Sequence, residues 1–194
     1  MVSIVTPVQP IPNGYMTAYV FETLGPDEAL GFTASESLSA LAGADSLAGE
    51  GGADTLAGGS GMDHLAGGAG SDVFVFGITD SGLTEATADR ITDFATGSDR
   101  LSLGVAGNAA AETGNFVEAG AAVADFAAAL LAAEAALSAL NGTAGGASAR
   151  LYAFEFDASN GYLFIDTDSD GDADQVIVLT AITSAGIAGS DIIA

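Results

Sequence analysis

The sequence predicts a mainly β protein, in which a coil of nine-residue repeats continues into a C-terminal β domain with one Ala-rich amphipathic helix. Three observations predict this: repeats rich in Gly and Asp, an apolar spacing of three and four over 123–140, and β-type runs after residue 150. We expect an N-terminal β-prone segment, a possible assembly or capping arm, over 1–30. The coil and its following strands take up 31–104, and the C-terminal domain takes up 105–194.

The repeats are four consecutive units of nine residues, which begin at Ala40: ALAGADSLA, GEGGADTLA, GGSGMDHLA and GGAGSDVFV. The third and fourth units match G-G-x-G-x-D-x-U-x at every defined position, where U is a large apolar residue. An imperfect unit, GFTASESLS, precedes them and has Glu36 in place of the Asp. Terminal units of a stacked coil are often atypical because they cap the stack.

Each Gly-Gly-x-Gly-x-Asp run predicts a turn, because glycine tolerates positive φ, and each x-U-x predicts a short strand. Two units complete one coil, so turns two units apart stack on the same edge. This arithmetic pairs Asp45 with Asp63 on one edge and Asp54 with Asp72 on the other. The predicted inner stack consists of Leu47, Leu56, Leu65 and Phe74.

The gaps between stacked turns are expected to bind Ca²⁺, because carbonyl and carboxylate oxygens form the hard shell that this ion prefers. A core one side chain deep cannot offset the ordering of so glycine-rich a chain, so we expect the coil to unfold without calcium. The expected metal positions in the coil are Asp45, Gly49, Gly51, Gly52, Asp54, Gly58, Ser60, Gly61, Asp63, Gly67, Ala69, Gly70, Asp72 and Asp99.

Charge supports the same expectation. The chain carries 3 Lys+Arg against 26 Asp+Glu, a formal net charge of -23, and self-repulsion of this size opposes folding until cations bind. Nucleic acid is excluded as a partner because no basic patch could neutralise phosphates. The chain has no Cys, which excludes disulfides and thiolate metal sites. No stretch predicts a transmembrane helix, and the N-terminus lacks the features of a cleavable signal peptide.

The run GGSGMDHLAGGAGSDVFVF resembles the nonapeptide repeat of the repeats-in-toxin family. The segments DVFVF, DRITDF and GSDRLSL, with the region down to SDIIA, are similar to the C-terminal region of serralysin-type proteases. The resemblance implies a right-handed parallel β-roll filled with calcium, in a secreted bacterial protein that folds outside the cell. It also implies export by type I secretion machinery that reads an uncleaved C-terminal signal, with which Asp191-Ile-Ile-Ala194 agrees. The same four residues equally suit a plain strand end.

The chain departs from this family where an enzyme would begin. The serralysin proteases carry an H-E-x-x-H zinc helix, whereas this chain has one histidine, His64, at an outward-facing repeat position. We therefore predict a non-enzymatic protein with no catalytic residues and no organic cofactor. A hydrolase that uses carboxylates alone is the less favoured alternative.

The C-terminal domain offers a second candidate metal site. The run Asp166-Thr-Asp-Ser-Asp-Gly-Asp-Ala-Asp174 matches the first half of an EF-hand loop, but Ile177 stands where the twelfth ligand would be. An incomplete calcium loop and a solvated acidic turn both suit this pattern. The candidate ligands are Asp166, Asp168, Asp170, Asp172 and Asp174.

The rest of that domain is expected to be an amphipathic helix ended by Asn141-Gly142, and a hairpin joined through Asn160-Gly161. Two functions remain open. One is a protein that self-assembles outside the cell into a filament, surface layer, or matrix or adhesive structure, with its own copies as partners. The other is a monomeric binding module or accessory factor.

Overall fold

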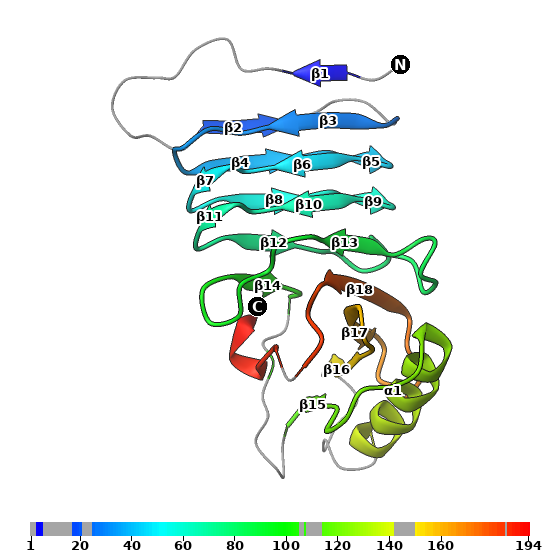
Figure 1. The fold of residues 1–194 in the computed structure, drawn as a ribbon. Coiled ribbons are helices and arrows are strands. Elements are labelled where there is room, and N and C mark those ends of the chain that lie inside the picture. Colours follow the sequence, from blue (N-terminus) through cyan, green and yellow to red (C-terminus); the bar gives the residue numbers. More distant parts are fainter. Residues whose placement is uncertain are drawn as a thin grey trace.

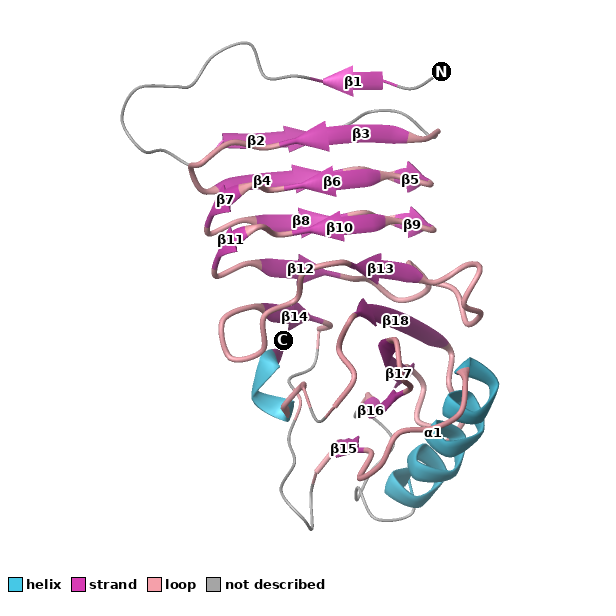
Figure 2. Cartoon of the chain, viewed as in Figure 1, coloured by secondary structure: helices cyan, strands magenta, loops and turns pink. Residues whose placement is uncertain are grey.

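The computed structural model describes residues 3–5, 17–20, 25–104, 107, 114–141, 150–184 and 186–194. Figure 1 shows a stack of flat coils that begins near the N-terminus and rests on a smaller C-terminal domain with one helix. Strands dominate the described chain, as the colours of Figure 2 show. The predicted mainly β fold is confirmed.

Two sheets form the roll, and their strands within the roll pair in parallel. The nine-stranded sheet runs in the order β1 (Ser3–Val5), β3 (Asp27–Leu30), β6 (Ser46–Ala48), β10 (His64–Ala66), β13 (Asp89–Ile91), β18 (Gln175–Thr180), β17 (Asn160–Asp166), β16 (Leu151–Phe156) and β15 (Phe116–Glu118). The six-stranded sheet runs in the order β19 (Ile192–Ile193), β14 (Arg100–Ser102), β12 (Val73–Val75), β8 (Thr55–Ala57), β4 (Glu36–Ser39) and β2 (Thr17–Val20). Successive repeats alternate between the sheets, which is the parallel β-roll that the repeats predict.

The turns pair as well. On one side β5 (Ala42–Gly43) pairs with β9 (Ser60–Gly61), and on the other side β7 (Gly51–Gly52) pairs with β11 (Ala69–Gly70). Each pair joins turns that are two units apart. Turn therefore stacks directly on turn along both edges of the roll.

The interior of the roll is a single stack of apolar side chains. Leu47 lies in register with Leu65, and Leu56 lies in register with Phe74. All four side chains are buried. The stack continues beyond the repeats through Ile91, Leu101, Leu179 and Ile192, which pair in register with these strands or with one another. The segment GSDRLSL, which contains β14, is therefore one more turn and strand of the roll.

The C-terminal domain closes one end of the roll. Strand β18 pairs in parallel with β13 and antiparallel with β17, so it is the strand at which the roll changes into an antiparallel sheet. Helix α1 (Phe126–Asn141) covers this sheet with Ala129, Ala133 and Leu137 buried. The Phe126 ring packs edge-on against Tyr162, with 5.3 Å between the ring centroids. The helix is thus packed on its own domain, and Gly142 lies outside the described residues.

The hairpin turn lies two residues earlier than predicted. Gly161 pairs with Phe156 inside the ladder, and the chain reverses through Ala158 and Ser159. The Asp157 carboxylate accepts the Ser159 and Asn160 amides at 2.6 and 2.8 Å, which stabilises the reversal locally. The prediction that the turn lies at Asn160-Gly161 is therefore wrong. Packing explains the glycine instead, because a Cβ at position 161 would lie 2.6 Å from the Phe154 ring.

The two termini of the described chain both belong to the roll. Strands β1 and β2, from the segment 1–30, are the outermost strands of the two sheets, and residues 1–2, 6–16 and 21–24 lie outside the described part. At the other end, β19 pairs in parallel with β14. Among the described helices, none is long and apolar enough to cross a membrane.

Candidate metal centre

Two columns of carboxylates follow the edges of the roll. The first, which we call the Asp63 edge, contains Asp27, Asp45, Asp63 and Asp89. Each aspartate amide donates to Oδ1 of the aspartate in the next coil: Asp27 to Asp45 at 2.7 Å, Asp45 to Asp63 at 2.8 Å and Asp63 to Asp89 at 2.8 Å. The pairing of Asp45 with Asp63 agrees with the two-units-per-coil arithmetic.

The second column, the Asp72 edge, repeats this pattern on the opposite side. The Glu36 amide donates to Oδ1 of Asp54 at 2.7 Å, Asp54 donates to Asp72 at 2.8 Å, and Asp72 donates to Asp99 at 3.0 Å. All four side chains are buried, so the imperfect first unit still supplies a carboxylate at the correct height.

One oxygen of each inner carboxylate is left over. Oδ2 of five aspartates is buried and has no hydrogen-bond partner; these are Asp45, Asp54, Asp63, Asp72 and Asp89. A buried charged acceptor without a partner costs free energy, and proteins rarely leave one unless an ion completes the site. A row of bound cations along each edge would explain why this unpartnered oxygen recurs in successive coils.

Backbone carbonyls face the same gaps. A Cβ built on Gly49 would contact Asp54 Oδ2 and would lie 2.7 Å from the Gly67 carbonyl oxygen. One coil earlier, a Cβ on Gly31 would lie 2.9 Å from Glu36 Oε2 and 2.6 Å from the Gly49 carbonyl oxygen. A carboxylate oxygen of one coil and a carbonyl oxygen of the next therefore converge on one glycine. This oxygen-only donor set fits Ca²⁺.

A methyl group at one of these glycines should disrupt a gap. In Gly58→Ala the new Cβ would meet Asp63 Oδ2 directly and would come within 2.6 Å of Asp63 Cγ. We expect weaker calcium binding and a loss of about 1–3 kcal/mol in the free energy of unfolding with calcium present. Isothermal titration and urea unfolding measure both quantities. Gly120→Ala, with open space around its Cβ position, is the control and should change neither.

Burial also changes the acidity of the columns. Removal from water raises the pKa of Asp54 and of Asp63 to about 6, and it raises the pKa of Asp89 to about 8. Neighbouring carboxylates add to this rise, and the backbone amide that each Oδ1 accepts opposes it. The pKa values of Asp45 and Asp72 are raised for the same reasons. Without cations, the folded roll favours protons at these positions.

The calcium-free protein should therefore become less stable as pH rises. The unfolded chain releases these protons near pH 4, whereas the folded form retains them up to about pH 6–8, so stability is lost between those values. Circular dichroism in chelator should show more folded protein at pH 5 than at pH 8. The calcium concentration at the folding midpoint should also rise at low pH, because protons compete with calcium for these carboxylates. Asp89→Asn should remove the part of this dependence between pH 6 and 8.

All the metal positions expected in the roll lie on these two edges. The glycines and small residues of the expected set line the stacked turns, including Ser60 and Gly61 in β9, and Ala69 and Gly70 in β11. Sequence reasoning missed further acids. Asp89 continues the Asp63 edge, and the Asp93 carboxylate accepts the amides of Gly67 and Gly68 at 3.0 and 2.7 Å.

These acids lie outside the nine-residue period, which hid them. For Asp89 the sequence does carry a signal. This residue stands two positions before an apolar strand residue in D-R-I, as Asp63 does in D-H-L and Asp72 does in D-V-F. A search for Asp-x-apolar beyond the repeats would have found Asp89, although the twelve residues between Phe76 and Asp89 break the spacing.

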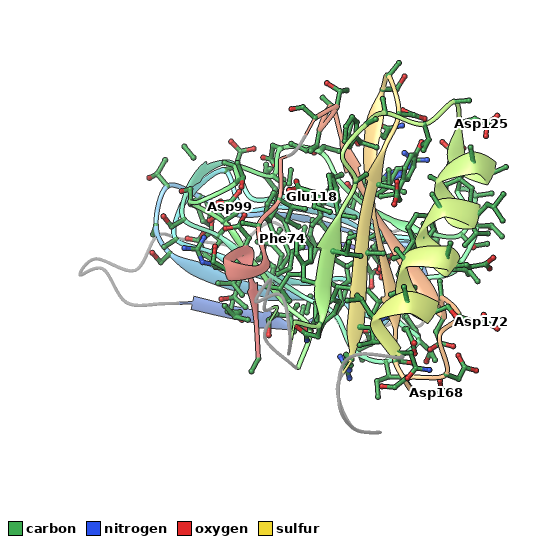
Figure 3. All side chains as sticks on the ribbon, turned by 90° about the horizontal axis from the view of Figure 1, so that it is seen from below. Phe74, Asp99, Glu118, Asp125, Asp168 and Asp172 are labelled. Carbon is green, nitrogen blue, oxygen red and sulfur yellow. The ribbon has the colours of Figure 1, made fainter. Side chains whose placement is uncertain are left out.

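The acidic loop after β17 gathers three of its five carboxylates. Oxygens of Asp166, Asp168 and Asp174 lie within 4.8 Å of one another. Asp166 is fully buried and accepts the Ser169 and Gly171 amides at 2.6 and 2.9 Å. Asp170 and Asp172 lie outside this group and are exposed. In Figure 3 the labelled Asp168 and Asp172 lie beside α1, in the C-terminal domain, whereas Asp99 belongs to the roll.

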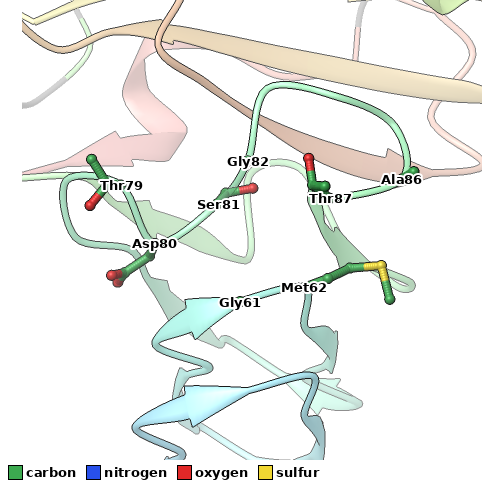
Figure 4. Close-up of a pocket in the computed structure, with 8 residues that line it drawn as sticks. All are labelled: Gly61, Met62, Thr79, Asp80, Ser81, Gly82, Ala86 and Thr87. Atoms are coloured by element: carbon green, nitrogen blue, oxygen red, sulfur yellow. The ribbon is translucent and has the colours of Figure 1, made fainter.

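An open pocket borders the Asp63 edge. Its volume is about 450 Å³, and it lies between the turn Gly61–Met62 and the loop 79–87 (Figure 4). Asp80 is the one titratable residue in its lining. The Ser81 hydroxyl is already engaged, because it donates to the Val176 carbonyl at 2.5 Å and accepts the Asp89 amide at 2.8 Å.

Comparison with known proteins places the chain in a family. Residues 33–140, more than half of the chain, match the family model described as the peptidase M10 serralysin C terminal. The chain belongs to this family. The match covers the repeats, both carboxylate columns except Asp27, and helix α1 except its last residue. Modules of this type belong to secreted bacterial proteins and bind calcium in parallel β-rolls.

A solved structure shares the fold. The AlgE6R2 subunit of the Azotobacter vinelandii mannuronan C5-epimerase is 24% identical, with a TM-score of 0.56 over 93% of this chain and 92% of that one. The AlgE6R3 subunit of the same enzyme is 22% identical, with a TM-score of 0.48 over 95% of this chain and 81% of that one. Among curated proteins no match was found.

Proposed function

We propose that this protein is a secreted, non-enzymatic module whose roll folds outside the cell when calcium fills the gaps between its turns. The single observation that carries the proposal is the unpartnered, buried Oδ2 that recurs along both edges. The net charge of -23 makes the calcium-free roll self-repelling, and bound divalent cations would reverse that. Calcium affinity should be about 10⁻⁴–10⁻³ M, as in other extracellular calcium modules.

The ions would be held by carboxylates of adjacent coils together with turn carbonyls. Asp45 and Asp63 would share ions on one edge, and Asp54, Asp72 and Asp99 would do so on the other. Each bound ion would supply charge neutralisation and crosslink two turns. Isothermal titration of chelator-stripped protein tests this, and an absence of heat and of structural change at millimolar calcium would contradict it.

The absence of catalysis is part of the proposal. The inner carboxylates of the two edges each accept a ladder amide through Oδ1, and the described pocket presents Asp80 alone as an ionisable group. Glycoside hydrolysis needs two carboxylates placed on either side of the scissile bond. A screen of polysaccharide and peptide substrates in calcium should show no turnover.

Self-assembly outside the cell is proposed from the open end of the roll. Strands β1 and β2 are the outermost strands there, and an edge strand presents backbone groups that a second copy can pair with. With calcium, sedimentation velocity should show multimers of the intact chain. Deletion of residues 1–20 should abolish them while calcium still compacts the protein.

Two outcomes would contradict assembly. A monomer at every calcium concentration would favour a monomeric binding module instead, for which the 450 Å³ pocket beside Met62 and Asp80 is the candidate surface. Multimers that persist without residues 1–20 would exclude the N-terminal strands as the contact.

Export by type I secretion machinery is the last part of the proposal, with Asp191–Ala194 as the signal read before folding. Removal of these four residues should abolish export from a cell that carries such machinery and leave cytoplasmic synthesis unchanged. Undiminished export of the shortened chain would contradict it.

A further inference from the structure

The C-terminal tail forms the last coil of the roll. After a short 3₁₀ turn, Gly189–Asp191, strand β19 pairs in register with β14, so that Leu101 faces Ile192 and Ser102 faces Ile193. Asp191 stands directly before this strand, as Asp72 and Asp99 stand before β12 and β14. Figure 1 shows the C-terminus beside β14 at the base of the roll.

The tail is also buried. Asp191 and Ile192 are each 1% exposed, and Ile192 belongs to the main apolar core. Two hydrogen bonds hold the backbone of the tail. The Leu103 amide donates to the Ile193 carbonyl and the Gly107 amide donates to the Ile192 carbonyl, both at 3.1 Å. A tail this enclosed contributes to folding rather than trailing into solvent.

Asp191 fastens the tail to the last turn of the Asp72 edge. Its Oδ2 accepts the Thr96 hydroxyl at 2.7 Å, and its Oδ1 accepts the Gly97 amide at 3.3 Å. Arg100 lies 3.4 Å from Oδ1 and also donates to the Asp99 carbonyl at 2.7 Å. These partners belong to the turn 95–100, so the tail binds a surface that exists only when that turn is formed.

The carboxylates of the Asp72 edge hold the turn 95–100 in place. Asp99 Oδ1 accepts the Asp72 amide at 3.0 Å while its Oδ2 accepts the Ala95 amide at 2.8 Å. Asp93, two residues before this turn, accepts the Gly67 and Gly68 amides. A continuous set of hydrogen bonds therefore leads from the inner gaps of the Asp72 edge to Asp191.

We propose that the C-terminal tail is a latch that reports calcium occupancy of the Asp72 edge. With calcium the turn 95–100 is ordered, and the tail docks through Asp191 as the final coil. Without calcium the turn loses its order, and the tail, including Ile192 and Ile193, becomes free. The free and docked states of the tail are therefore mutually exclusive. This inference rests on the proposed calcium-dependent folding.

Carboxypeptidase digestion of the full chain, followed by mass spectrometry, tests the latch. Removal of Ile193 and Ile192 should be slower by about ten- to a hundredfold in millimolar calcium than in chelator, because Ile192 must leave the core before it is cleaved. Circular dichroism on the same samples reports whether the roll has folded.

Three variants sharpen the test. Asp191→Asn weakens the bonds to Thr96 and Arg100, and Gly107→Ala places a Cβ 2.5 Å from the Gly189 carbonyl oxygen. Both should lose most of the protection of the tail in calcium while the circular dichroism of the roll stays close to that of the intact protein. Glu28→Gln, which removes one exposed charge from β3 far from the tail, should retain full protection.

The outcomes separate the two proposals. A protein that folds on calcium while its tail is cleaved equally fast in both conditions overturns the latch and leaves the proposed function standing. A tail protected equally with calcium and with chelator also overturns the latch. A protein that does not fold on calcium overturns the proposed function, and the latch with it.

Discussion

Replacement of Asp63 by alanine is expected to lower calcium affinity more than any other single change in the roll. Its carboxylate is fully buried in the central coil, and Oδ1 accepts the Asp45 amide while Oδ2 is free for an ion. Burial raises the pKa of this carboxyl, the neighbouring Asp45 and Asp80 add to the rise, and Asp63 in turn raises the pKa of Asp89. Loss of Asp63 therefore removes a ligand between carboxylates on both sides.

The Asp63→Ala effect should be about ten- to a hundredfold in calcium midpoint, and about 1–3 kcal/mol in unfolding free energy, since the Asp45 amide also loses its partner. Isothermal titration and urea unfolding in calcium provide the measurements. Asp45→Ala, one coil nearer the open end, is the matched comparison and should have a smaller effect. Equal effects of the two changes would contradict the ladder described for this edge.

Phe74→Ala should be the most damaging substitution in the apolar stack. The ring is fully buried where the repeats meet the later strands, in register with Leu56 on one side and Leu101 on the other. It also packs against Phe94, with 6.2 Å between the ring centroids. A core one side chain deep has few neighbours that can move into the cavity, so the cost should lie at about 3–5 kcal/mol.

Urea unfolding in saturating calcium measures this cost, and calcium affinity measured separately should fall only as far as folding is impaired. Val73→Ala on the same strand is the control, because its side chain is only partly buried and faces outward. A loss from Phe74→Ala no larger than that from Val73→Ala would mean that the stack does not stabilise the roll.

The repeats allowed much of the roll to be predicted because each unit combines turn chemistry with one apolar residue at a fixed spacing. That regularity determines which side chains share the interior, as with Leu56 and Phe74, and which aspartates share an edge. The acidic loop could be located but not resolved into its parts, because only the folded backbone brings Asp166, Asp168 and Asp174 together.

The failures have physical causes. Asn160-Gly161 carries the composition of a tight turn, yet Asp157 supplies the capping bonds, and Gly161 serves the Phe154 ring. Asp89 and Asp93 complete the columns after an insertion, which no fixed period reveals. The role of Asp191 depends on contacts with Thr96 and Arg100, about ninety residues away, and no local pattern encodes a contact at that distance.

Hydrogen exchange during a calcium titration of chelator-stripped protein tests the central claim most directly. We predict that the amides of β4, β6, β8, β10 and β12 exchange freely in chelator and become protected together as calcium reaches about 10⁻⁴–10⁻³ M. The longer antiparallel strands β16 to β18, with their aromatic core, should retain more protection in chelator. Equal protection of the roll strands in chelator and in millimolar calcium would contradict the claim that calcium folds this protein.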